Sequence, residues 1–158
     1  MPKRTLEAGV ARRAGLAEPV AIVHAGTLEN LPRFLGFIDD VCDRIEADEG
    51  TKYALRLAVE EVCTNLIVHG YKNRPAGPIE VVAVDDRDRV TLVIHDRSPP
   101  FDPNNAPAPD LTSDVEHRRL GGLGWHLVKK MVDEIRYVPG MTSGNVLTLV
   151  KRKTPVRT

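Results

Sequence analysis

Residues 58–71 read Ala-Val-Glu-Glu-Val-Cys-Thr-Asn-Leu-Ile-Val-His-Gly-Tyr. Its apolar residues recur every three or four positions, which predicts an amphipathic helix from Lys52 to His69 that ends at Gly70. Glu61 and Asn65 lie one turn apart at the border of the apolar face. A carboxylate can take a proton, and an amide oxygen can ligate a hard cation such as Mg²⁺. Taken alone, such a pair is more often two surface side chains that hydrogen-bond each other.

Two further segments contain candidate site residues. Asp96 follows the apolar run Val90 to His95, so its carboxylate emerges at the end of a strand, where it can accept a hydrogen bond from an exocyclic amine such as that of adenine. Gly121-Gly-Leu-Gly124 opens another helix, and the backbone N–H groups at a helix start stabilise phosphate oxygens. Considered separately, the first segment is ordinary turn chemistry and the second is as often a packing device.

The remaining pattern places these segments in one α+β domain. Apolar spacing predicts a first helix that starts at Asn30 and Pro32 and ends at Gly50, and a third helix that runs from the glycines to about Glu134. The predicted strands are Val20 to His24, Ile79 to Val84, Val90 to His95, Ile135 to Val138 and Asn145 to Lys151. This order favours a two-layer α/β sandwich, with a mostly antiparallel sheet and three helices on one face. Ser98 to Leu120, with five prolines, is a long loop of the kind that often forms a lid.

Composition limits the domain count and the partners. The 158 residues, 42% of them apolar and 28% charged, suffice for one compact core, with a flexible leader over 1–18, the domain over 19–153 and a tail over 154–158. Lysine plus arginine equals aspartate plus glutamate at 22 each, so no overall field attracts nucleic acid or anionic lipid. Without an apolar run of about 18 residues or a secretory signal, we expect a cytoplasmic protein with no membrane partner.

In combination and in this order, the three motifs resemble those of the GHKL (Bergerat-fold) ATPases. Ala58 to Tyr71 is similar to their N box, Asp96 to Pro103 to their first glycine box, and Gly121 to Glu134 to their second. Pro100 to Pro103 and Gly144 to Leu149 are most similar to the anti-sigma factor serine/threonine kinase branch. The resemblance covers about Val20 to Arg152, which is nearly the whole chain.

The resemblance implies a role for each matching residue. Glu61 would be the general base, Asn65 would bind the nucleotide and its Mg²⁺, and Asp96 would contact the adenine amine with support from Thr148. Residues 104–120 would form the lid over ATP. The residues expected to line the phosphates are Gly121, Gly122, Leu123 and Gly124. Ser98 would lie at the nucleotide, at the position where the family has the glycine of its Asp-x-Gly motif. A serine there adds a Cβ where the backbone approaches the nucleotide closely.

The implied function is an ATP- and Mg²⁺-dependent protein serine/threonine kinase. In this branch the acceptor is an anti-anti-sigma factor, the same domain sequesters a sigma factor, and the protein is a homodimer without direct nucleic-acid contact. Ser98 favours an alternative, a non-catalytic or weakly catalytic regulatory module that sequesters a protein partner. A free-standing ATPase with another signalling output shares the same pocket.

Overall fold

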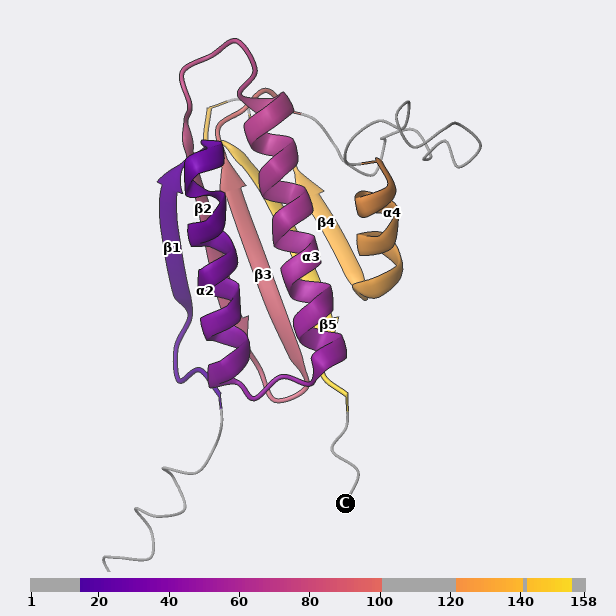
Figure 1. Ribbon diagram of the computed structural model, residues 1–158. Helices are drawn as coiled ribbons and strands as arrows, with labels where there is room; N and C mark the ends of the chain where they lie inside the picture. Colours follow the sequence, from indigo (N-terminus) through magenta and orange to yellow (C-terminus); the bar gives the residue numbers. More distant parts are fainter. Residues whose placement is uncertain (1–14, 101–121, 141, 155–158) are drawn as a thin grey trace, which may run out of the picture.

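The computed structural model describes residues 15–100, 122–140 and 142–154, which form a sheet layer and a helix layer (Figure 1). The sheet has the strand order β1-β2-β3-β5-β4 with every neighbouring pair antiparallel, and it confirms the predicted α+β class. The elements in chain order are β1 (Val20–Ala25), the 3-10 turn η1 (Leu28–Asn30), α2 (Leu31–Arg44), α3 (Glu49–Asn65), the π-helical turn η2 (Leu66–Gly70), β2 (Pro78–Asp85), β3 (Arg89–Asp96), α4 (Gly122–Met131), β4 (Glu134–Val138) and β5 (Asn145–Arg152).

Strand alternation determines which face of the sheet is covered. Val81, Leu92 and Leu149 are fully buried against the helices, whereas residues of the opposite parity face the uncovered side. The register places Asp96 opposite both Ile79 of β2 and Asn145 of β5. The end of β3 and the start of β5 therefore lie side by side at one edge of the molecule.

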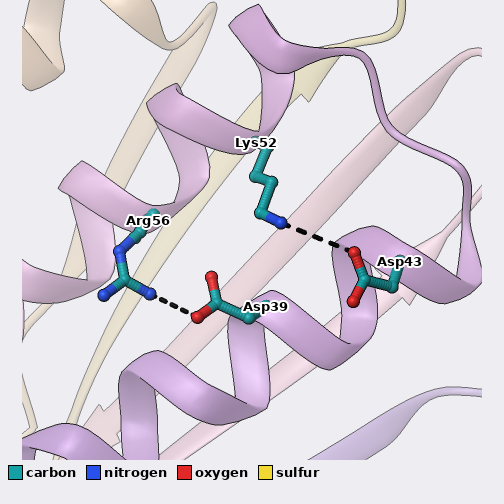
Figure 2. Close-up of polar contacts among 4 residues, drawn as sticks. All are labelled: Asp39, Asp43, Lys52 and Arg56. Atoms are coloured by element: carbon teal, nitrogen blue, oxygen red, sulfur yellow. Dashed lines mark hydrogen bonds and ion pairs between the residues drawn. The ribbon is translucent and has the colours of Figure 1, made fainter.

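The helices α2 and α3 bury the apolar stripes that the sequence predicts. Phe34 and Ile38 of α2 and Leu55 and Val59 of α3 are fully buried. On the solvent side two ion pairs cross between the helices, Arg56 Nη1 to Asp39 Oδ2 at 2.5 Å and Lys52 Nζ to Asp43 Oδ1 at 3.5 Å (Figure 2). Pairs this exposed contribute roughly 0–1 kcal/mol each. The core residues therefore dominate the stability of the helix pair.

Several helix ends differ from the prediction, among them both ends of α3, which runs from Glu49 to Asn65 rather than from Lys52 to His69. The first helix, α2, ends at Arg44 rather than at Gly50, and Gly50 belongs to the first turn of α3. Asp48 caps α3 by accepting hydrogen bonds from the Thr51 hydroxyl at 2.5 Å and its backbone N–H at 3.4 Å. This capping lowers the pKa of Asp48. The third helix ends at Met131, because Glu134 already pairs with Val150 as the first residue of β4.

Two residues of the predicted leader, Gly15 and Leu16, contact the domain. The Gly15 N–H donates to the Arg44 carbonyl at 3.2 Å, and the Leu16 N–H donates to Asp85 Oδ2 at 3.1 Å. The Leu16 side chain is buried in the core, and Asp85 also pairs with Lys153. The rest of the predicted leader, residues 1–14, lies outside the described residues. Within the described part, no helix combines the length and apolarity that a bilayer span requires.

Candidate functional site

The helix that carries Glu61 and Asn65 changes its winding just beyond them. Helix α3 ends at Asn65 and continues as the π-helical turn η2, which the Tyr71 N–H closes by donating to the Leu66 carbonyl at 2.8 Å. Single π turns inside helices occur frequently at functional sites. Because η2 adds a wider turn at the end of α3, it carries the chain towards the end of β3.

Glu61 lies directly against the start of α4. A Cβ built on Gly124 would be 2.0 Å from the Glu61 carboxylate carbon and 2.1 Å from Oε1, so only glycine leaves room for this carboxylate. The carboxylate is half-buried, and burial raises the pKa of Glu61, with a smaller contribution from the neighbouring charge of Glu60. A raised pKa suits a group that must accept a proton near neutral pH.

The other end of the same segment touches the Asp96 turn. A Cβ on Gly70 would lie 3.0 Å from both Cβ and Oγ of Ser98. The ten residues from Glu61 to Gly70 therefore contact the glycine-rich helix start at one end and the strand-end turn at the other. Asn65, which is half-buried, lies between these two contacts. The three segments that the sequence singles out are thus neighbours in the structure.

The Asp96 carboxylate is fixed by a buried hydrogen-bond network. Its Oδ1 accepts from the Ser98 N–H at 2.8 Å, from the Ser98 hydroxyl at 2.5 Å and from Asn145 Nδ2 at 3.0 Å. Asp96, Ser98 and Asn145 are 6%, 7% and 1% exposed, respectively. The Ser98 side chain is therefore turned towards Asp96 and Gly70, and it does not project into open space.

Tyr71 holds the backbone beside Asp96. Its hydroxyl donates to the Pro78 carbonyl at 2.8 Å and accepts from the Arg97 N–H at 2.9 Å. The ring is packed so closely that a Cβ on Gly77 would lie 2.7 Å from it, and one on Gly26 2.9 Å. Tyr71 therefore joins the end of η2 to the residue that follows Asp96.

The prediction for Thr148 requires a correction. Thr148 pairs with Val93 on the uncovered side of the sheet, between the core residues Leu147 and Leu149, so it does not lie beside Asp96. The residue on β5 that contacts Asp96 is Asn145. Strand alternation indicates which of the two residues faces the helices. Asn145 has the same parity as the core residues Leu147 and Leu149, whereas Thr148 has the opposite parity.

The glycine-rich segment is described from Gly122 onwards. Gly122 and Leu123 form the first residues of α4, and Gly124 and Trp125 follow in the same turn. Trp125 is 5% exposed, and its buried Nε1 has no hydrogen-bond acceptor among the described residues. Gly121 and the predicted lid, residues 104–120, lie outside the described residues.

A shallow hollow of about 220 Å³ lies on the other side of the sheet, between Val23, Glu80, His95 and Arg97. Asp96 also lines it, but Val23, Glu80 and His95 have the strand parity opposite to that of the core residues, so this hollow opens on the uncovered face and the nucleotide is not assigned to it. No cluster of three or more histidine, cysteine, aspartate or glutamate side chains that could hold a metal occurs in the described ranges. A cation at Asn65 would have to take its other ligands from water and from the nucleotide, as Mg²⁺ commonly does.

The two-layer fold and the three meeting segments define a class, the ATP-binding domains of the histidine kinase type. The family model described as "Histidine kinase-like ATPase domain" matches residues 25–151. The chain belongs to this family, and the match confirms the GHKL resemblance.

The chain is similar to curated proteins named serine-protein kinase RsbW. It is 32% identical to the one from Bacillus cereus strain Q1 over 133 residues, which cover 80% of this chain and 75% of the relative. The relative from Bacillus anthracis strain CDC 684 is 31% identical over the same coverage. Among solved structures, the RsbU and RsbW domains of Rv1364c from Mycobacterium tuberculosis align with a TM-score of 0.62 at 21% identity. That alignment covers 89% of this chain and 34% of the other, and it supports the fold.

Proposed function

We propose that this chain is an ATP-dependent protein serine/threonine kinase of the anti-sigma type. It transfers the γ-phosphoryl group to a hydroxyl on an anti-anti-sigma factor and also sequesters a sigma factor. The observation that supports this proposal best is the contact of Glu61 with Gly124, together with the contact of Gly70 with Ser98. The similarity to proteins named serine-protein kinase adds the reaction class.

The residues divide the chemistry between them. The acceptor hydroxyl oxygen forms a bond to the γ-phosphorus, the bond from that phosphorus to the β,γ-bridging oxygen breaks, and ADP leaves. Glu61 takes the proton of the hydroxyl. The backbone N–H groups at the start of α4 bind phosphate oxygens, and Asp96 accepts a hydrogen bond from the adenine amine. Mg²⁺, held through Asn65, would neutralise charge on the phosphates.

A labelling experiment tests the proposal. The chain is incubated with Mg²⁺, γ-labelled ATP and a purified anti-anti-sigma protein, beside Glu61→Ala and a Glu60→Ala control. We expect label on a serine or threonine of the acceptor with the parent and the control, and its loss with Glu61→Ala. ATP binding without transfer by the parent would instead identify the regulatory module. Phosphate release without a labelled acceptor would indicate a free-standing ATPase.

Ser98 is the residue that favours the regulatory module, and its geometry weakens that case. A side chain at this position would obstruct a nucleotide if it projected into the site. The Ser98 hydroxyl instead bonds Asp96 at 2.5 Å, and the residue is only 7% exposed. Gly70 provides the space that this side chain occupies. The kinase therefore remains the better supported function.

We also propose a homodimer that forms through the uncovered face of the sheet. The outward-facing positions are rich in valine, among them Val23 and Val138 at 51% and 52% exposure. Five strands about 4.8 Å apart and about 20–25 Å long present roughly 500–600 Å² in projection. This is close to the roughly 800 Å² of accessible surface that each partner buries in a standard interface.

Light scattering after size-exclusion chromatography tests the dimer. Val93→Lys places a charge at the centre of this face, opposite Val82 and Thr148. We expect the dimer mass for the parent and the monomer mass for this variant. Tyr53→Lys is the matched control, since Tyr53 is an exposed apolar side chain on α3 at 56% exposure. A monomeric parent, or a dimeric Val93→Lys, would rule out this interface.

A further inference from the structure

Asp85 is a buried carboxylate that the proposed kinase chemistry does not use. It is the last residue of β2, where strand parity points its side chain to the same side as the core residues Val81 and Ala83. The side chain is only 6% exposed. A carboxylate is tolerated in such a place only where a cation and hydrogen-bond donors compensate for the water that it loses. For Asp85 these partners come from two segments that are far apart in the sequence.

The first partner is the segment that precedes β1, residues 15–19, which we call the strap. The Leu16 N–H donates to Asp85 Oδ2 at 3.1 Å, and the Leu16 side chain is buried in the core. The Gly15 N–H donates at 3.2 Å to the carbonyl of Arg44, the last residue of α2, which a helix end would otherwise leave open. Gly15 has a φ of +151°, and a Cβ there would lie 2.8 Å from Asp85 Oδ2, so glycine permits this approach. The strap therefore joins the end of α2 to the end of β2.

The second partner is Lys153, which directly follows β5. Its Nζ pairs with Asp85 Oδ1, and its backbone N–H donates at 2.8 Å to the Asp88 carbonyl in the connection between β2 and β3. The Lys153 side chain is 27% exposed, so its ammonium can still be reached from solvent. Each oxygen of the Asp85 carboxylate thus serves one segment, Oδ2 the strap and Oδ1 the residue after β5.

The two contacts depend on each other because they compensate the same charge. A hydrogen bond to an ionised carboxylate is about twice as strong as one between neutral groups. Without the Lys153 ammonium, a largely buried carboxylate would keep a single backbone donor, and it would turn towards water and away from the Leu16 N–H. Loss of one contact therefore weakens the other, and such coupling acts in both directions.

We propose that Asp85 is a latch through which the residue after β5 controls the strap. While Lys153 pairs with Asp85, the strap is held closed. A partner or a linked segment that engages the Lys153 ammonium releases the strap and uncovers the part of the core that Leu16 covers. The latch lies at the start of β3, whereas Asp96 lies at the opposite end of that strand, so this inference does not depend on the proposed kinase function (Figure 1).

Amide hydrogen exchange of the full chain, followed by NMR, tests the latch. The Leu16 amide reports opening of the strap, and the amide of Leu92, a fully buried residue of β3, reports unfolding of the whole domain. We expect the Leu16 amide to be less protected than the Leu92 amide in the parent. In Lys153→Met, exchange at Leu16 should rise by about tenfold, the fold-change of one hydrogen bond to a charged group. Lys153→Arg keeps the charge and should exchange as the parent does.

Two further variants separate the latch from a general loss of stability. Lys151→Met, two residues earlier on β5, is the matched control and should leave exchange at Leu16 unchanged. Asp85→Asn keeps the shape of the side chain and removes its charge, so exchange at Leu16 should rise, and adding Lys153→Met to it should have no further effect. Unchanged exchange at Leu16 in Lys153→Met, or an equal rise with and without Asp85→Asn, would overturn the inference. Equal protection of Leu16 and Leu92 in the parent would also overturn it, because the strap would then open only with the whole domain.

Discussion

The contact between Glu61 and Gly124 leads to a prediction in which stability and activity change in opposite directions. Gly124→Ala adds one methyl group that would lie 2.0 Å from the Glu61 carboxylate carbon. Carbon atoms in favourable contact are about 3.5–4.0 Å apart, so the carboxylate must move by about 1.5–2 Å. Such a movement costs little folding free energy, because the displaced atoms are the end of a flexible side chain.

The helix itself gains from the substitution. Alanine is favoured over glycine inside a helix by roughly 0.5–1 kcal/mol, and somewhat less in a first turn. A catalytic group displaced by about 1 Å can lose roughly 10²-fold in rate. We therefore expect Gly124→Ala to unfold at the same temperature as the parent or slightly above it, while phosphoryl transfer falls by roughly 10- to 100-fold.

Gly36→Ala is the matched control, because Gly36 lies inside α2 and a Cβ there meets no atom within 4 Å. It should raise stability by roughly 0.5–1 kcal/mol and leave transfer unchanged. The assays are thermal unfolding and initial rates of labelling of the acceptor at saturating ATP. If Gly124→Ala transferred phosphate at the parent rate while Glu61→Ala did not, Glu61 would not need the position that it has against Gly124.

Three further predictions concern the surroundings of the site. Burial and the Glu60 charge raise the pKa of Glu61, and since a base must be ionised to act, transfer should be lost as pH falls through this raised pKa. Glu60→Gln should move the acid limb of the rate profile to lower pH. An unmoved limb would count against Glu61 as the base. Tyr71→Phe leaves the Pro78 carbonyl and the Arg97 N–H without their partner, so the free energy of unfolding measured with denaturant should fall by about 1–3 kcal/mol. A change below about 0.5 kcal/mol would show that water replaces the hydroxyl. A double-mutant cycle with Arg56→Ala and Asp39→Ala should give a coupling energy below about 1 kcal/mol, and a larger value would mean that the pair is shielded from solvent.

Much of the fold could be predicted from local patterns. The runs that became β2 and β3 are short and rich in β-branched apolar residues, and the charged Asp85 to Arg89 connection became the turn between them. Both helix stripes were correct because burial on one face requires the three-to-four spacing. The helix ends were less reliable. A glycine often ends a helix, which predicts an end at Gly50, but a glycine is also tolerated in a first turn. The capping bond from Thr51 to Asp48 determines where α3 begins.

The sequence singles out segments that prove to be neighbours in the structure, but it does not show the contacts between them. Glu61, Asn65 and Asp96 stand out in the sequence because polar groups border apolar runs. The contact between Gly124 and Glu61 joins residues far apart in the chain, and no local pattern reveals it. Asn145 could have been found from strand parity, whereas the expectation for Thr148 rested on the family resemblance and took no account of parity. The fit of Ser98 against Gly70 also depends on two positions in different elements.

Trp125 gives this molecule a built-in optical reporter. It is the only tryptophan in the chain, and it sits in α4 next to the glycine that Glu61 contacts. Indole emission responds to the polarity around the ring, and here the ring is 5% exposed. A shift of α4 relative to α3 would change its emission wavelength without any attached dye. Stopped-flow mixing could therefore follow rearrangement of the helix layer in the unmodified protein on the millisecond scale.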